Sequence, residues 1–136
     1  MRLDIYQRET ARIAQEQTAL LDEARRKLRL GLRLSPLEQA GVLHAMQVLI
    51  ENAIGKAKKM LKTANAPVPV SAYEAFSDLV RLGLIDAMKL DQWNRIVGIR
   101  NRIVHDYINL DINLVNGIVQ EGGYQFIADF LGHWEA

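Results

Sequence analysis

Apolar residues recur at helical spacing along most of the chain, and no stretch shows the alternation of a half-buried strand. The first helical pattern extends from about Leu3 to Leu30, and Gly31 is a typical end signal. The second pattern begins with Ser35 as N-cap, Pro36 as first helical residue and Glu38 as the partner in a capping box. These patterns predict two long N-terminal helices. The second is expected to bury Leu43, Met46, Ile50, Ala53, Ile54, Ala57 and Leu61.

A short third helix is expected after a proline-rich break. Pro67 and Pro69 prevent the second helix from continuing. Beyond them, Ser71 and Glu74 form a second predicted capping box, and the helix that they open is expected to stop at Gly83.

The remaining sequence predicts two further helices. Asp86 is the expected cap of a fourth helix that runs to about Tyr107, and Asn109 and Asp111 mark the turn that follows. The fifth helix contains Gly122-Gly123, where we expect a kink. The sequence therefore predicts an all-α, up-and-down bundle of about five helices, formed by a single domain over residues 1–136.

Composition narrows the class of protein. The chain is 49% hydrophobic and 24% charged, which suits a globular domain, and it has no Cys, which excludes disulfides and thiolate metal sites. No signal peptide or apolar run of membrane-spanning length is apparent, so we expect a soluble cytoplasmic protein without membrane contact. All 17 Lys and Arg residues lie in residues 1–105, whereas residues 106–136 hold five of the 16 acidic residues. The basic body is weak evidence for a polyanionic ligand.

The stretch from Arg100 to Tyr107 is the most unusual part of the sequence. On a helix, Arg100 falls in the middle of an apolar face, where a Leu would be less costly. Burying a guanidinium there costs on the order of several kcal/mol unless an anionic group meets it. His105 and Tyr107 add a titratable ring and a hydroxyl nearby, so we expect a binding site. The expected face comprises Trp93, Ile96, Val97, Arg100, Ile103, Val104 and Tyr107.

These residue types suit RNA cleavage without a metal ion. Such a reaction needs a base near the 2′-OH, an acid at the leaving oxygen and a cation on the phosphorane. His105 can serve in either proton role near neutral pH, and Arg100 offers two-pronged donation to a phosphate. On a straight helix, however, the two side chains point about 140° apart. Either the helix ends or distorts near Val104, or a second subunit supplies the other half of the site. The second alternative is favoured because the reaction needs two proton transfers and the motif has one imidazole.

The spacing Arg100-Asn101-(x)3-His105-x-Tyr107 resembles the R-x4-H-x-Y signature of HEPN-domain proteins, specifically the HepT-like branch. The resemblance extends to the helix layout, with a long first helix, a second helix opened by Ser-Pro, a proline-rich break, a short Leu-rich helix and a final acidic helix. It implies an HEPN-type fold over nearly the whole chain.

The resemblance further implies a toxin of a type II toxin–antitoxin pair that acts as a metal-independent ribonuclease and needs no cofactor. Such proteins form homodimers with their motifs facing each other, and an MntA-like minimal nucleotidyltransferase antitoxin silences them by attaching AMP to the motif tyrosine. By this resemblance Arg100 contacts the scissile phosphate, His105 acts as acid or base, Asn101 supports them, and Tyr107 is the hydroxyl that is modified.

The expected position of Tyr107 agrees with silencing by modification. On a continuous helix it lies on the Arg100 face, two turns along, so an adenylyl phosphate on its oxygen would occupy the place of a substrate phosphate. We therefore expect Tyr107→Phe to keep RNA cleavage and to escape silencing.

Each of these residues also has a structural interpretation. Arg100 can extend past the apolar face to an acidic partner such as Glu51 or Asp86, and His105 can stabilise the end of its helix. Tyr107 can be an aromatic at the edge of the core. Arg102, on the opposite face, is interpreted as solvated or as an RNA contact, and Glu51 as a residue that orients Arg100 or His105.

Other polar residues carry less information. His44 and His133 lack the spacing of metal ligands, so no metal site is predicted. Four lysines lie near the end of the second predicted helix: Lys56, Lys58, Lys59 and Lys62. We interpret them as a solvated helix end, and an RNA-binding surface is the alternative.

Two other functions remain open at this point. The chain can be a non-catalytic helical partner that docks a nucleotidyltransferase, in which case His105→Ala should be tolerated. It can also be a nucleotide-binding module in which Arg100 holds a triphosphate, which a nucleotide titration would reveal.

Overall fold

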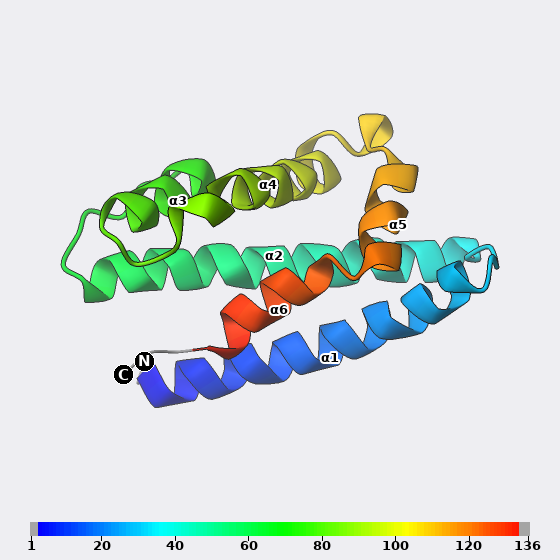
Figure 1. Cartoon of the computed structure of the whole chain (residues 1–136), viewed down its shortest axis with the longest axis horizontal. Helices are drawn as coiled ribbons and strands as arrows, with labels where there is room; N and C mark the ends of the chain where they lie inside the picture. The colour runs from blue at the N-terminus through cyan, green and yellow to red at the C-terminus, as the bar shows by residue number, and fades with distance from the viewer. Residues whose placement is uncertain (1–2, 134–136) are drawn as a thin grey trace.

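The computed structural model describes residues 3–133, and within them the chain forms six α-helices and two 3-10 turns without a strand (Figure 1). The all-α prediction is confirmed. The elements are α1 (Leu3–Arg29), α2 (Pro36–Thr63), α3 (Ala72–Arg81), η1 (Ala87–Lys89), α4 (Leu90–His105), η2 (Tyr107–Asn109), α5 (Ile112–Glu121) and α6 (Tyr124–Gly132).

Helix α2 is the centre of the bundle. Figure 1 shows it between α3 and α4 on one side and α1 and α6 on the other, and it packs against all four. Every residue of its predicted apolar stripe is buried. Where α3, α4 and α6 meet, the rings of Trp93 and Phe76 stack with their centroids 4.3 Å apart, and Phe130 meets Trp93 edge-on at 4.8 Å. Burial of these large rings stabilises that end of α4.

The start of α2 forms as the sequence predicts. Ser35 Oγ accepts a hydrogen bond from the Glu38 amide at 3.1 Å, and Glu38 Oε1 accepts one from the Ser35 amide at 2.8 Å. Lys27, near the end of α1, bonds to the same carboxylate, and together Lys27 and Ser35 lower the pKa of Glu38. Gly31 has φ +76°, the left-handed conformation expected of a residue that ends a helix. The predicted capping box of α3 is half formed in the described structure, since Ser71 Oγ accepts from the Glu74 amide at 3.3 Å without a return bond.

Helix α4 is shorter than predicted at both ends. Asp86 caps the 3-10 turn η1 by accepting from the Met88 amide at 2.9 Å, and α4 itself begins only at Leu90. At the other end α4 stops at His105 rather than Tyr107. Asp106 leaves the helical conformation (φ −147°, ψ 47°), and its carboxylate accepts from the Asn109 side chain at 2.8 Å. An Asp side chain that bonds forward along the chain competes with helix continuation in this way.

The predicted fifth helix is two helices, which corrects the expected number from about five to six. Gly122 has φ +78°, and its amide donates to the carbonyls of Ile118 and Val119, which ends α5. A Cβ on Gly123 would lie 2.9 Å from Ile118 Cγ2, so both glycines are needed for the sharp turn into α6. The kink expected at Gly122-Gly123 is therefore a full break.

Lys56 corrects the interpretation of the lysine run. Its side chain is only 2% exposed, and its ammonium donates to the carbonyls of Phe130 and His133 at the end of α6. The C-terminal end of a helix carries partial negative charge and unpaired carbonyls, which explains why a cation is held there. Lys58 and Lys59 are half-buried, and of these four lysines only Lys62 is exposed.

Within residues 3–133, none of the helices has both the length and the apolar character needed to cross a membrane.

Candidate functional site

Arg100 lies at the boundary between the core and the surface of α4. Its side chain is 28% exposed, and its Nε donates to Glu51 Oε1 of α2 at 3.2 Å. Its Nη1 donates to Asn101 Oδ1 at 3.0 Å. The sequence offered Glu51 or Asp86 as the acidic partner, and the structure selects Glu51. Since Nη2 has no hydrogen bond to any described residue, one edge of the guanidinium remains available for an anion.

The apolar face around Arg100 differs from the predicted one. Ile103 is buried as expected, but Val104 is 41% exposed and Ile99, which the sequence pattern did not place on the face, is buried. The last turn of α4 therefore rises out of the core. For this reason Arg100 meets water as well as Glu51, and its burial costs less than a full transfer to the interior.

His105 is the last residue of α4 and is exposed. Its ring makes no hydrogen bond to another described residue, so its nitrogens do not bond the carbonyls of the last turn. The alternative in which His105 serves as a hydrogen-bonding cap has no support in the geometry. Its position at the helix end still places a cation favourably when the ring is protonated.

Tyr107 does not lie on the face of Arg100 as predicted. Because α4 ends at His105, Tyr107 belongs to the separate turn η2, where it is 58% exposed. The next residue, Ile108, is 95% exposed. Nothing in the sequence pattern signalled this exposure, since an isoleucine after a helical motif is usually part of the core.

Arg102 contacts the turn rather than extending freely into solvent. Its Nη1 donates to the backbone oxygen of Asn109 at 3.3 Å and lies 4.0 Å from Asp106 Oδ2. The structure thus brings the predicted residues into two groups. Arg100, Asn101 and Glu51 are joined by hydrogen bonds, whereas Arg102 belongs with the turn that carries Tyr107. Within residues 3–133, no side-chain hydrogen bond or ion pair joins either group to the ring of His105.

Hollows open on the surface of the described residues where helices meet. A groove of about 490 Å³ runs between α4 and α5, with Ile96 and Ile99 on one wall and Leu114 and Ile118 on the other. A larger hollow of about 800 Å³ lies over the aromatic cluster near Lys56, and none of the predicted site residues lines it. The sequence pattern signals neither hollow, because each depends on how helices pack against one another and not on the residues of a single helix. Among residues 3–133, no three His, Asp or Glu side chains gather closely enough to hold a metal ion.

Comparison with known proteins agrees with this fold. The sequence pattern of the HepT-like ribonuclease family matches residues 14–132. The mRNA nuclease HepT of Shewanella oneidensis is 30% identical over 82 residues, which are 60% of this chain and 62% of that protein. The match thus spans less than two thirds of the relative.

Two solved structures share the fold. One, a crystal structure of a toxin–antitoxin with AMP-PNP, superimposes with a TM-score of 0.77 at 19% identity, over 96% of this chain and 99% of the other. The second is a tri-AMPylated Shewanella oneidensis HEPN toxin in complex with MNT antitoxin. It superimposes with a TM-score of 0.64 at 22% identity, over 88% of this chain and 96% of the other.

Proposed function

The chain belongs to the HepT-like ribonuclease family, and we propose that it is the toxin of a type II toxin–antitoxin pair that cleaves RNA without a metal ion. The observation that carries the proposal is the state of Arg100. Its guanidinium is held by Glu51 and Asn101 and keeps one edge free, in the same helix as an exposed, unpartnered imidazole at His105.

Arg100 is suited to bind the scissile phosphate. Two of its nitrogens are occupied by oxygens of Glu51 and Asn101, which fixes the plane of the guanidinium before a ligand arrives. A donor already held in place needs no reorganisation as charge builds up on the phosphorane, and such donors stabilise a transition state most effectively. Asn101 and Glu51 are accordingly positioning residues in this proposal.

His105 is the proposed acid or base. Removal of the 2′-OH proton lets that oxygen attack the phosphorus, and the bond to the 5′-oxygen breaks as this oxygen receives a proton. An exposed imidazole exchanges protons readily near neutral pH. One His105 per chain cannot hold both positions at once, and it points about 140° away from Arg100 on the helix. We therefore propose a homodimer whose two motifs form a composite site across a two-fold axis.

Tyr107 is the proposed site of silencing by an MntA-like nucleotidyltransferase antitoxin. Its side chain is more than half exposed, so a second protein can reach the hydroxyl. An AMP group there would add negative charge close to the motif and repel the RNA backbone. The structurally similar HEPN toxin is AMPylated and bound to an MNT antitoxin, which supports silencing by AMP transfer as the kind of regulation.

Induced expression of the chain alone tests the proposed function. We expect growth arrest with fragmentation of total RNA, and we expect both Arg100→Ala and His105→Ala to abolish it. His44→Ala is the matched control, because His44 is also exposed but lies outside the motif on α2. Circular dichroism of each purified variant verifies folding. Equal behaviour of the wild type and the folded motif variants would contradict the proposal and favour a non-catalytic docking role.

A further inference from the structure

The turn that follows α4 is fixed by its own side chains. Asn109 Nδ2 donates to Asp106 Oδ1 at 2.8 Å, and Arg102 donates to the Asn109 backbone oxygen at 3.3 Å. Two backbone bonds of 3.1 Å close the turn, from the Asn109 amide to the Asp106 carbonyl and from the Leu110 amide to the Tyr107 carbonyl. We call Arg102, Asp106 and Asn109 the clasp.

The clasp orders a segment whose side chains bury little of their surface against the rest of the chain. Ile108 is 95% exposed and Tyr107 is 58% exposed. Fixing a backbone costs conformational entropy, and an exposed isoleucine returns none of it through burial. Two further apolar side chains, Val104 before the turn and Leu114 after it, are also exposed. A partner protein that packs on the turn would bury these side chains next to the Tyr107 hydroxyl, and that burial would favour its binding.

We propose that the turn over residues 106–110 is the element by which the modifying nucleotidyltransferase recognises this chain. Ile108 is its apolar contact, and the clasp presents Tyr107 in the orientation that transfer requires. The inference rests on the proposed function, in which Tyr107 accepts AMP. It assigns Arg102 to positioning of the turn rather than to substrate binding.

The chemistry of transfer explains why the neighbour of Tyr107 matters. The phenolic oxygen of Tyr107 attacks the α-phosphorus of a nucleoside triphosphate and forms the new P–O bond. The bond from that phosphorus to the bridging oxygen breaks, pyrophosphate leaves, and the phenolic proton passes to a base or to water. An enzyme that aligns this attack must enclose the tyrosine ring, and the side chain next to it in a tight turn lies within the contact surface.

RNA is a less suitable partner for Ile108. An RNA backbone is bound by cations and its bases by aromatic or Arg planes, neither of which an isoleucine supplies. A second copy would make Ile108 part of a subunit interface, and this possibility gives a different result in the experiment below.

The experiment measures AMP transfer from labelled ATP to the purified chain by the nucleotidyltransferase of the same toxin–antitoxin pair. For Ile108→Ala we expect KM for the chain to rise about tenfold with little change in kcat, as for an ordinary interface hot spot. For Asp106→Ala, which removes the acceptor of Asn109, we expect a lower kcat. Asp106→Asn keeps a side-chain oxygen for that bond, and we expect it to restore most of the rate.

Val70→Ala is the matched control. Val70 is an aliphatic residue with 93% exposure in the loop that joins α2 to α3. In Figure 1 this loop lies on the left of the bundle, and the turn after α4 lies on the right. We expect it to leave KM unchanged. RNA cleavage and the oligomeric state by size exclusion are measured for Ile108→Ala in parallel, and both should match the wild type.

The outcomes separate this inference from the proposed function. Transfer to wild-type Tyr107 with unchanged kinetics in Ile108→Ala and Asp106→Ala would overturn the inference alone. A change of oligomeric state in Ile108→Ala would overturn it in favour of a contact between copies. Absence of label on the wild type, or equal label on Tyr107→Phe, would overturn both.

Discussion

The two ends of helix α4 differ in the burial of their side chains. Trp93, near its start, is 2% exposed and stacks on Phe76, and Val97 one turn later is fully buried. In the last turn Val104 and His105 are exposed, and the carboxylate of Asp106, the residue that ends the helix, accepts a hydrogen bond from Asn109 of the following turn. The first end stabilises the bundle, whereas the second contributes little to it.

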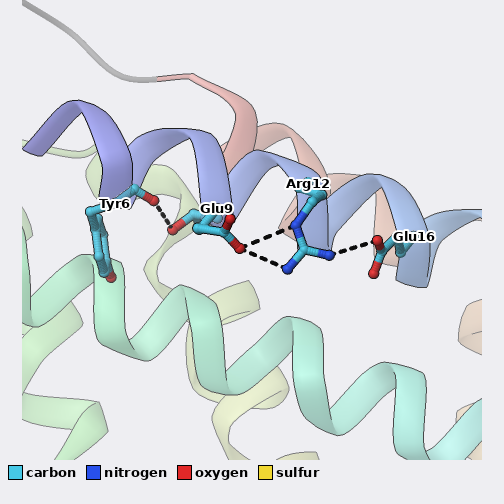
Figure 2. Close-up of polar contacts among 5 residues, drawn as sticks. Tyr6, Glu9, Arg12 and Glu16 are labelled. Carbon is cyan, nitrogen blue, oxygen red and sulfur yellow. Dashed lines mark hydrogen bonds and ion pairs between the residues drawn. The ribbon is translucent and has the colours of Figure 1, made fainter.

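Arg100 stands between these two ends, and a second arginine shows what is particular about it. Figure 2 shows Arg12 of α1 between Glu9 and Glu16, with Nε and Nη2 bonded to Glu9 and Nη1 to Glu16. The hydrogen bonds to Glu9 and Glu16 raise the pKa of Arg12. Every nitrogen of Arg12 is thus occupied by carboxylate, whereas Arg100 has one carboxylate, one amide oxygen and a free edge. An arginine left partly unsatisfied next to the core is the one able to bind an added anion.

The largest expected effect on stability is at the buried end of α4. Trp93→Ala removes a ring packed against Phe76, Phe126 and Phe130, and we expect the free energy of unfolding to fall by about 4 kcal/mol. Denaturant unfolding followed by circular dichroism measures it. Tyr73→Ala, at an aromatic residue that is 41% exposed, is the control and should cost about 1 kcal/mol or less. Equal losses in the two variants would show that the contrast between buried and exposed aromatics does not hold.

The next largest effect, on the rate of RNA cleavage, is expected at Arg100, between the two ends of α4. Glu51→Ala removes the carboxylate that holds Arg100, and we expect RNA cleavage to slow by on the order of tenfold to 10²-fold through misplacement of the guanidinium. Glu51→Gln keeps an oxygen in the same place and should lose less. Unchanged cleavage in Glu51→Ala would mean that Arg100 needs no support from α2.

A smaller effect is expected far from the motif, where α6 joins α1. The Tyr124 hydroxyl donates to Asp22, and burial together with this bond raises the pKa of Tyr124 to about 12. Tyr124→Phe should lower the free energy of unfolding by about 1.5 kcal/mol at pH 8. An unfolded tyrosine loses its proton near pH 10. The stabilisation is therefore complete below that pH and is lost as the pH rises from about 10 through 12. Unfolding curves at a series of pH values should show the gap between the two proteins closing over this range, and a gap that widens would contradict the assignment.

Features decided by neighbouring residues were predictable from the sequence. Ser35 and Glu38 lie three residues apart, so their capping box follows from local chemistry, as does the left-handed Gly31. The expected end of α4 was wrong because Asp106 bonds to Asn109 instead of continuing the helix. The periodic pattern of apolar residues carries no information about such a side-chain hydrogen bond.

Features decided by distant residues were only partly predictable. The cost of burying Arg100 indicated that an anionic partner was needed, but the choice of Glu51 over Asp86 depends on how α2 and α4 pack. Lys56 was misinterpreted because its partners, the carbonyls of Phe130 and His133, come from the end of α6. The exposure of Ile108 follows from the turn that Asp106 starts, and a helix prediction through Tyr107 could not reveal it.

The central claim is that the exposed end of α4 carries the chemistry. It is tested most directly by cleavage of an end-labelled RNA by the purified chain in the presence of a metal chelator. We expect the wild type and His44→Ala to cleave at the same rate and His105→Ala to be slower by at least about 10²-fold, the usual contribution of a general acid or base. Equal cleavage by folded His105→Ala, or loss of wild-type cleavage on chelation, would contradict the claim.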